Sequence, residues 1–266
     1  MTPVNVTQGT SAIILGMPHA GTYAPPDIAA DLNTNGQELA DTDWHIDRLY
    51  ADLLRDATTV RANFHRYVID ANRDPQGVSL YPGQNTTTLV PLTDFDGQGI
   101  WTTLPADADI AQRLAEFHAP YHAALSAEIK RVRDLHGHVI LFDCHSIRSR
   151  IPFLFDGTLP DFNIGTDQGK TCAPEIEKAV HDICKTAPGY TSVLNGRFKG
   201  GWTTRHYGRP TQGVHAIQLE LAQSTYLTTE TAPWAYDPTR AAKLRHYLAH
   251  ILATLAALAP SSGTTT

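Results

Sequence analysis

The chain is poor in cysteine and has no long apolar run. Three cysteines occur among 266 residues, and no two of them form a Cys-x-x-Cys pair. This excludes a disulfide framework and favours a reducing compartment. No run reaches the roughly 20 apolar residues of a membrane span, and the N-terminal residues lack a basic stretch followed by an apolar core. We therefore expect a cytoplasmic protein.

Lysine and arginine are also scarce and scattered. The formal net charge is -6, and the basic residues form no block. This argues against nucleic acid or an anionic membrane as a partner. Neither a Gly-x-Ser-x-Gly elbow nor a P-loop nor a dinucleotide fingerprint after a strand is present. A small charged substrate, bound by a few local groups, remains compatible with this composition.

The chain does contain apolar runs that alternate with helical patterns. Such alternation predicts a single α/β domain over 1–258, with a mixed, mostly parallel sheet and helices on both faces. Helices are expected over 46–54, over 110–129 with a kink at Pro120, and over 244–255. Residues 259–266 read as a frayed tail, and 74–105 and 195–213 as loops over a site. The expected strands are 11–17, 58–62, 66–71, 138–143, 190–194 and 214–221.

Two of the apolar runs end in histidines. His19 follows the run 11–17, and His145 follows 138–143. Ligands in open α/β sheets gather beyond the carboxyl ends of strands, so the two imidazoles are expected to meet there. A catalytic zinc usually has three protein ligands and one open position. Each histidine alone could equally be structural, but the pair at two strand ends favours a metal site.

The third ligand is sought at the start of the first helix, where residues 43–47 offer three candidates. At about 100° per residue, Asp43 lies closest to the apolar stripe of this helix, and His45 lies away from it. A helix N-cap is the simpler explanation of Asp43, and a surface ion pair is the simpler explanation of Asp47. All three candidates, Asp43, Asp47 and His45, stay open at this point.

Two further groups suit an anionic substrate and proton transfer. Asn72 and Arg73 follow the expected strand 66–71, where a guanidinium can bind a carboxylate through two parallel hydrogen bonds. An ion pair of Arg73 with Asp70 or Asp74 is the competing explanation. Glu220 shares one face of the last strand with Gln218, on an element expected to be buried. Buried carboxylates are rare unless they are paired or used, so Glu220 is the candidate general base.

Nucleophilic catalysis by Cys144 or Ser146 is the rival chemistry. Neighbouring side chains of a strand point to opposite faces, so Cys144 and His145 do not readily form a dyad. Free cysteine is also a common core residue. The metal interpretation is therefore preferred.

The same segments, in the same order, resemble the N-formylglutamate amidohydrolase family, whose members release formate and glutamate in histidine breakdown. No single motif is specific, but the series spans most of the chain. The family is in turn similar to zinc carboxypeptidases and aspartoacylases. The matching segments are 18–21, 43–50, 66–73, 143–149, 200–208 and 218–220.

The resemblance implies a role for several residues. His19, His145 and Glu220 match the ligands and the late glutamate of the carboxypeptidases, and Asn72 with Arg73 matches their Asn-Arg pair. The glutamate of their His-x-x-Glu pair is replaced here by Thr22. The acidic ligand must then come from elsewhere, with Asp43 first, Asp47 second and His45 third.

The implied substrate carries two carboxylates, so more than one arginine is required. Arg73 is the first, and Arg205 or Arg148 is expected to bind the side-chain carboxylate. Arg205 lies in a glycine-rich segment that permits close approach of the backbone or a lid movement.

Together these expectations predict a metal-dependent hydrolase of N-formyl-L-glutamate. His19, Asp43 and His145 hold a divalent metal, with zinc favoured and manganese, cobalt or iron compatible with the same ligand types. Glu220 moves the proton. The alternatives are a deacylase or carboxypeptidase acting on another N-acyl amino acid or peptide, and a catalytically silent dicarboxylate-binding protein. The sequence leaves the oligomeric state open.

Overall fold

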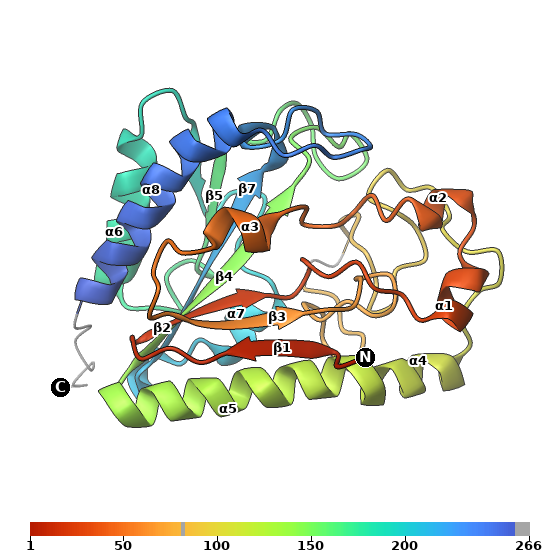
Figure 1. Cartoon of the computed structure of the whole chain (residues 1–266), viewed down its shortest axis with the longest axis horizontal. Helices are drawn as coiled ribbons and strands as arrows, with labels where there is room; N and C mark the ends of the chain where they lie inside the picture. Colours follow the sequence, from red (N-terminus) through yellow and green to blue (C-terminus); the bar gives the residue numbers. More distant parts are fainter. Residues whose placement is uncertain (81–82, 259–266) are drawn as a thin grey trace.

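The computed structural model describes residues 1–80 and 83–258, which build a sheet at the centre of the molecule. Within these residues, seven strands pair in the order β1-β3-β2-β4-β7-β5-β6 (Figure 1). The expected tail, 259–266, lies outside the described residues, and the assignment of 1–258 to one domain stays a prediction. The strands are β1 (Val4–Thr7), β2 (Ile13–Met17), β3 (Thr58–Ala62), β4 (Val139–Ile147), β5 (Phe162–Gly165), β6 (Ser192–Leu194) and β7 (Val214–Ala222).

The predicted mixed, mostly parallel sheet is confirmed. β3, β2, β4 and β7 pair in parallel, as do β5 and β6, whereas β1 pairs with β3 and β5 with β7 in antiparallel fashion. Every residue of β2, β4 and β7 is buried. Strands covered on both faces are rich in apolar residues, as β2 and the first half of β4 are, and the polar residues of β4 and β7 lie mainly toward their carboxyl ends.

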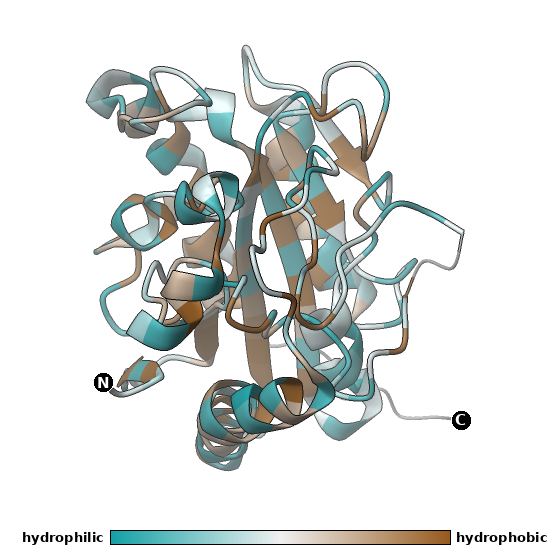
Figure 2. Cartoon of the chain, turned by 90° about the vertical axis from the view of Figure 1, so that its right-hand side faces the viewer, coloured by the Kyte–Doolittle hydropathy of each residue, from teal (hydrophilic) through white to brown (hydrophobic). Residues whose placement is uncertain are grey.

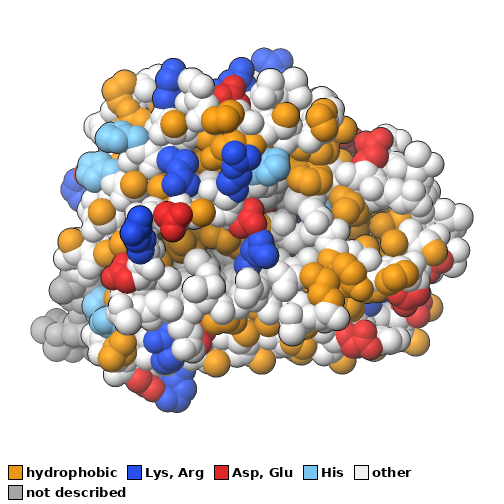
Figure 3. All heavy atoms as spheres, viewed as in Figure 1, with side chains coloured by type: hydrophobic (Ala, Val, Ile, Leu, Met, Phe, Trp, Pro, Cys, Tyr) orange, Lys and Arg blue, Asp and Glu red, His pale blue; other side chains and the backbone are white. Residues whose placement is uncertain are grey.

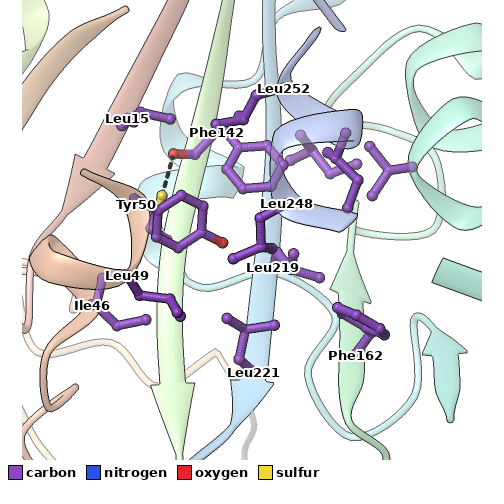
Figure 4. Close-up of a cluster of buried hydrophobic side chains, with 14 of the residues drawn as sticks. Leu15, Ile46, Leu49, Tyr50, Phe142, Phe162, Leu219, Leu221, Leu248 and Leu252 are labelled. Atoms are coloured by element: carbon purple, nitrogen blue, oxygen red, sulfur yellow. Dashed lines mark hydrogen bonds between the residues drawn. The ribbon is translucent and has the colours of Figure 1, made fainter. Parts of the chain in front are cut away.

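Helices cover both faces of the sheet. One face packs against α3, α6 and α8, and Figure 4 shows side chains of α3 and α8 meeting those of β4 and β7 there. The other face packs against α5, and Figure 2 shows apolar strands between amphipathic helices. The helices are α1 (Pro26–Asp31), α2 (Thr34–Gln37), α3 (Ile46–Tyr50), α4 (Asp107–Arg113), α5 (Ala119–His136), α6 (Pro174–Thr186), α7 (Trp202–Tyr207) and α8 (Pro238–Ala257).

One expected strand does not form. Residues 66–71 lie in a turn-rich segment, in which the backbone N–H of Val68 donates to the carbonyl of His65 and that of Asp70 to the carbonyl of Leu89. The Asp70 side chain also accepts the Asn72 backbone N–H at 2.8 Å, so it turns the chain locally. The apolar residues of this segment are buried without a strand partner. Burial alone gives the same apolar sequence pattern as a strand, so the expected strand 66–71 was wrong.

Three element boundaries differ from the prediction in ways that affect the site. β4 continues to Ile147, so His145 lies inside the strand and not beyond its end. α3 begins only at Ile46, because His45 takes a left-handed conformation (φ 58°). Asp43 therefore precedes the helix, and the helical-face argument for it was wrong.

The kink expected at Pro120 takes the form of a π-helical turn over Leu114–His118 just before α5, since proline cannot donate a backbone hydrogen bond.

The surface carries mixed charge. On the face seen in Figure 3, lysine and arginine side chains lie among aspartate and glutamate side chains instead of forming one continuous basic patch. Among the described residues, no helix combines the length and apolar character needed to span a membrane.

Candidate metal centre and pocket

Three buried side chains converge at the carboxyl ends of β2 and β4. His19 follows β2, Asp43 lies in the loop before α3, and His145 lies near the carboxyl end of β4. One ligand atom from each lies within 4.8 Å of the others, and this is the arrangement of a group that could hold a metal ion. The Asp43 Oδ2 atom is 3.1 Å from Nδ1 of His145 and 3.8 Å from Nδ1 of His19. The imidazoles of the two histidines therefore do meet.

A second carboxylate holds the far side of the His19 ring. The Nε2 atom of His19 lies 2.7 Å from Oδ1 of Asp70, and Arg66 donates to the other oxygen of Asp70 at 2.7 Å. Burial raises the pKa of Asp70, but the nearby guanidinium groups of Arg66 and Arg73 outweigh it and hold that pKa well below its ordinary value. Asp70 is thus ionised and accepts the proton on Nε2. This leaves the Nδ1 lone pair of His19 directed at Asp43.

His145 is oriented in the same way by its own strand. Its Nε2 atom lies 3.1 Å from Oδ1 of Asp143, two residues earlier on the same face of β4. Thr204 donates to the other oxygen of Asp143 at 2.9 Å. Burial lowers the pKa of His145, whereas the Asp143 and Asp43 carboxylates raise it and prevail. Metal-binding histidines usually donate their second ring N–H to a carboxylate, as His19 does to Asp70. The Nε2 atom of His145 also lies 3.3 Å from the side-chain nitrogen of Asn72.

The donor set is itself a test of the metal interpretation. The Nδ1 atoms of His19 and His145 both face the Asp43 carboxylate, so three donor atoms of the kind that bind metals meet at one point. The 3.1 and 3.8 Å separations suit ligands around one ion with bonds of about 2 Å. The donor set therefore fits a divalent metal.

Asp43 owes its position to backbone contacts and not to helix capping. Its backbone N–H donates to the carbonyl of His19 at 3.1 Å, and the backbone N–H of Ser146 donates to its side chain at 3.2 Å. The N-cap of α3 is His45 and makes no side-chain capping bond. His45 instead contacts the carbonyl of Trp234, and Asp47 forms a partly exposed ion pair with Arg61. Of the three candidates, only Asp43 faces the two histidines.

Glu220 lies beside this centre on the neighbouring strand. It is the register partner of His145 between β4 and β7, and it lines the same pocket. Gln218, two residues earlier on the same face, donates to its carboxylate at 3.1 Å. Burial raises the pKa of Glu220 to about 7, against the opposing effect of His145. A carboxyl group in this state can both accept and release a proton near neutral pH.

The pocket beside the centre has a volume of about 100 Å³ and is walled by both long loops that the sequence singled out. Segment 74–105 supplies Asn85, Thr86 and Thr87, and segment 195–213 supplies Arg197, Phe198 and Gly201. Asn72 and Arg73 also line it. Both segments therefore lie over one site as expected, but residues 202–207 of the second form α7 and not a loop.

The arginines of the pocket differ in part from those expected. Arg73 is present, and it lies 3.7 Å from Asp70, which is the contact that the competing ion-pair explanation required. Arg148 pairs with Asp96 at 2.8 Å, and Arg205 pairs with Asp167 at 3.3 Å. Neither Arg148 nor Arg205 is among the described residues that line the pocket. Two arginines that were not considered, Arg66 and Arg197, line it instead.

The comparison with known proteins shows the family of the chain. The family model of N-formylglutamate amidohydrolase matches residues 11–227, which include every residue of the centre described above. The chain belongs to this family. N-formylglutamate deformylases of Pseudomonas aeruginosa and Pseudomonas putida are each 44% identical to it over 254 residues, covering 94% of both chains.

Solved structures agree with this membership of the amidohydrolase family. The crystal structure of N-formylglutamate amidohydrolase from Ralstonia eutropha superposes with a TM-score of 0.80 at 25% identity, covering 96% of this chain and 97% of that one. A gene product of Agrobacterium tumefaciens superposes with a TM-score of 0.73 at 18% identity, covering 96% and 94%, and this shows a shared fold.

Nucleophilic catalysis by the strand residues of this amidohydrolase has no geometric support. Cys144 is buried in the core on the opposite face of β4 from His145, and its thiol donates to the carbonyl of Phe142 (Figure 4). Burial raises the pKa of the Cys144 thiol well above its ordinary value, which suppresses the reactive thiolate. The Ser146 hydroxyl accepts a hydrogen bond from Tyr226 at 2.7 Å.

Sequence reasoning missed the residues that support this amidohydrolase centre from behind. Asp143 could have been found from strand alternation, since it lies two residues before His145. Asp70 could have been found as the acid just before the Asn-Arg pair. For Arg197 the only signal was its place in a glycine-rich loop, which does not select one arginine over another.

Proposed function

We propose that this protein hydrolyses the formyl amide of N-formyl-L-glutamate to formate and L-glutamate, as in histidine degradation. His19, Asp43 and His145 hold the divalent metal, Glu220 moves the proton, and Asn72 with Arg73 binds a carboxylate of the substrate. The observation that carries the proposal is the meeting of three metal-type ligands with Glu220 in one pocket. The choice of substrate is supported by the N-formylglutamate deformylases that are 44% identical over 94% of the chain.

The reaction needs a base that later acts as an acid. Glu220 accepts a proton from the attacking water as the water oxygen bonds to the formyl carbon. The same carboxyl group then delivers that proton to the nitrogen as the C–N bond breaks, and the second proton of the water passes from formic acid to the amine. The products are therefore formate and glutamate with a protonated amino group. Gln218 orients the Glu220 carboxylate through the 3.1 Å hydrogen bond.

The substrate must be held so that its amide faces Glu220. Arg73 carries the charge for a carboxylate, and its guanidinium is oriented by hydrogen bonds of 2.9 and 2.8 Å to Thr87. The Asn72 side chain accepts the backbone N–H of Thr203 at 2.8 Å and so is fixed beside His145. Preorganised groups of this kind lower the entropy cost of reaching the reactive geometry.

A divalent metal, when bound by His19, Asp43 and His145, supplies Lewis acidity that makes water a better nucleophile and the formyl carbonyl a better electrophile. Two imidazoles and one carboxylate suit zinc best, and manganese, cobalt and iron accept the same donors. Burial of the centre strengthens the electrostatic stabilisation of the developing oxyanion.

The proposal is tested by metal analysis and by a substrate comparison. Purified protein is expected to contain about one divalent ion per chain and to hydrolyse N-formyl-L-glutamate faster than N-acetyl-L-aspartate or a cell-wall peptide. Removal of the metal with a chelator is expected to abolish turnover, and adding zinc back is expected to restore it. The matched control is protein carried through the same steps without chelator.

Three outcomes would contradict the proposal. A clear preference for the acetylated amino acid or the peptide would replace the deformylase with a deacylase or a peptidase. Metal binding without turnover of any amide, together with tight binding of glutarate, would indicate a silent dicarboxylate-binding protein. Full activity in metal-free protein would remove the metal from the mechanism.

A further inference from the structure

Arg197 lies in the wall of the pocket, on the segment that follows β6. Its guanidinium donates to the carbonyl of Leu154 at 3.2 Å and to that of Asn85 at 3.2 Å. Leu154, Asn85 and Phe198 line the pocket with it. Two contacts from different segments therefore fix the orientation of this cation at the pocket surface.

Arg197 and Arg73 are attached to the same stretch of pocket wall. Arg73 donates to the carbonyl and the hydroxyl of Thr87, and Arg197 donates to the carbonyl of Asn85, two residues earlier. Two residues of chain span at most about 7 Å. The two carboxylate carbons of an extended glutamate are roughly 5 Å apart, at about 1.5 Å per bond. The two guanidinium groups are thus held by neighbouring residues of one pocket wall, within reach of the two ends of one dicarboxylate.

The other arginines of the region serve different partners. Arg66 is buried and pairs with Asp70 at 2.7 Å, so its charge stabilises the carboxylate that holds the His19 ring. Arg148 and Arg205 pair with Asp96 and Asp167, and they do not line the pocket among the described residues. An arginine that binds the side-chain carboxylate of the substrate must lie at the pocket surface, and Arg197 does so.

We infer that Arg197 is the specificity-determining residue for the side-chain carboxylate of the substrate, while Arg73 binds the other carboxylate. This inference rests on the proposed deformylase function and deepens it. Apolar neighbours such as Leu154 and Phe198 pack against the methylene groups between the two carboxylates. The site then selects an N-acyl amino acid that carries a second negative charge at the distance of glutamate.

The test compares N-formyl-L-glutamate with N-formyl-L-glutamine, which has the same shape and lacks the second charge. Wild-type protein is expected to favour the glutamate compound in kcat/KM. In Arg197→Gln, kcat/KM for the glutamate compound falls on the order of 10- to 100-fold, the usual effect of losing a charged hydrogen bond. The value for the glutamine compound stays within about threefold, which also shows that the variant is folded. Arg197→Lys is expected to recover part of the preference.

The matched control is Arg150→Gln, which removes an exposed arginine away from the described pocket lining. It is expected to keep the wild-type preference. Equal loss on both substrates in Arg197→Gln would overturn the specificity role, and so would an unchanged preference. Failure of the wild-type protein to hydrolyse either compound would instead refute the proposed function, so the two failures are distinguishable.

Discussion

Asp43 is the residue on which the proposed metal centre depends most. Its carboxylate is buried, and it accepts the backbone N–H of Ser146 while facing the Nδ1 atoms of two histidines. A buried carboxylate is costly unless hydrogen bonds or a positive charge compensate it, and the proposed divalent ion supplies such a charge.

His145→Ala is expected to lose the metal and, with it, almost all turnover. Removing one of three protein ligands leaves a coordination set that two side chains cannot hold tightly. Metal content per chain after dialysis measures this, with His250→Ala, an exposed histidine of α8, as control. Retention of a full equivalent of tightly bound metal by His145→Ala would exclude His145 as a ligand.

Glu220→Gln separates proton transfer from metal binding. The amide keeps the shape of the side chain but cannot accept the proton, so kcat is expected to fall about 10²- to 10⁴-fold. Metal content should stay near one equivalent, because Glu220 is outside the ligand group. The control is Glu38→Gln, which changes an exposed glutamate. A Glu220→Gln protein with near wild-type kcat would show that another group moves the proton.

Among the elements, α5 and the π-helical turn before it support the segment that carries Asn72 and Arg73. His118, the last residue of the turn, and His122 of α5 contact the carbonyls of Arg73 and Ala71 at 3.1 and 2.7 Å, on either side of Asn72. His122 also lies 3.0 Å from the hydroxyl of Tyr207 in α7. The turn and helix together hold the backbone of the Asn-Arg pair and contact α7.

This contact predicts a pH dependence of stability. Burial lowers the pKa of His122 from 6.5 to about 3. His122 therefore binds a proton near pH 6.5 in the unfolded chain but stays neutral there in the folded protein. The stabilisation that is present above pH 6.5 is lost as the pH falls toward 3. His122→Gln keeps a donor and an acceptor but does not titrate.

The expected result is a shallower pH profile for His122→Gln. Between pH 6 and 4.5, its free energy of unfolding should fall by up to about 1.4 kcal/mol per pH unit less than that of the wild type. Urea denaturation at several pH values measures the difference. His250→Gln is the control, since solvent reaches that imidazole in the native protein as well. Parallel profiles for His122→Gln and the wild type would contradict a neutral, buried His122.

For the whole molecule, the proposed metal would link segments that are distant in sequence. The proposed ligands follow β2, precede α3 and lie in β4, so one ion would connect the carboxyl ends of two neighbouring parallel strands. A ligand that binds only the folded state stabilises it by mass action.

Chelation is therefore expected to lower the melting temperature. At free metal about 100 times the dissociation constant, the stabilisation is about 2.7 kcal/mol. For a protein of this size, this corresponds to a shift of roughly 5–10 °C. Calorimetry of the native, metal-depleted and zinc-restored protein measures it, and His145→Ala, already lacking the metal, should not respond. An unchanged melting temperature in verified metal-free protein would argue against a shared ion.

Local sequence patterns determined the central strands β2, β4 and β7, because each is rich in apolar residues, as parallel strands buried on both faces are. They also marked His19, His145 and Glu220, which lie at or near the ends of those strands. Residues 66–71 show the limit of such patterns, because an apolar segment can be buried without pairing. Its turn is held by the Asp70 side chain.

Only the tertiary structure decided which acid faces the two histidines and which arginines line the pocket. The sequence left Asp43, Asp47 and His45 open as candidates, and the left-handed residue at His45 separates them in space. Arg148 and Arg197 are equally basic, but ion pairing takes one to Asp96 and loop packing brings the other to the pocket. Contacts between segments far apart along the chain govern such choices, and local periodicity carries no information about them.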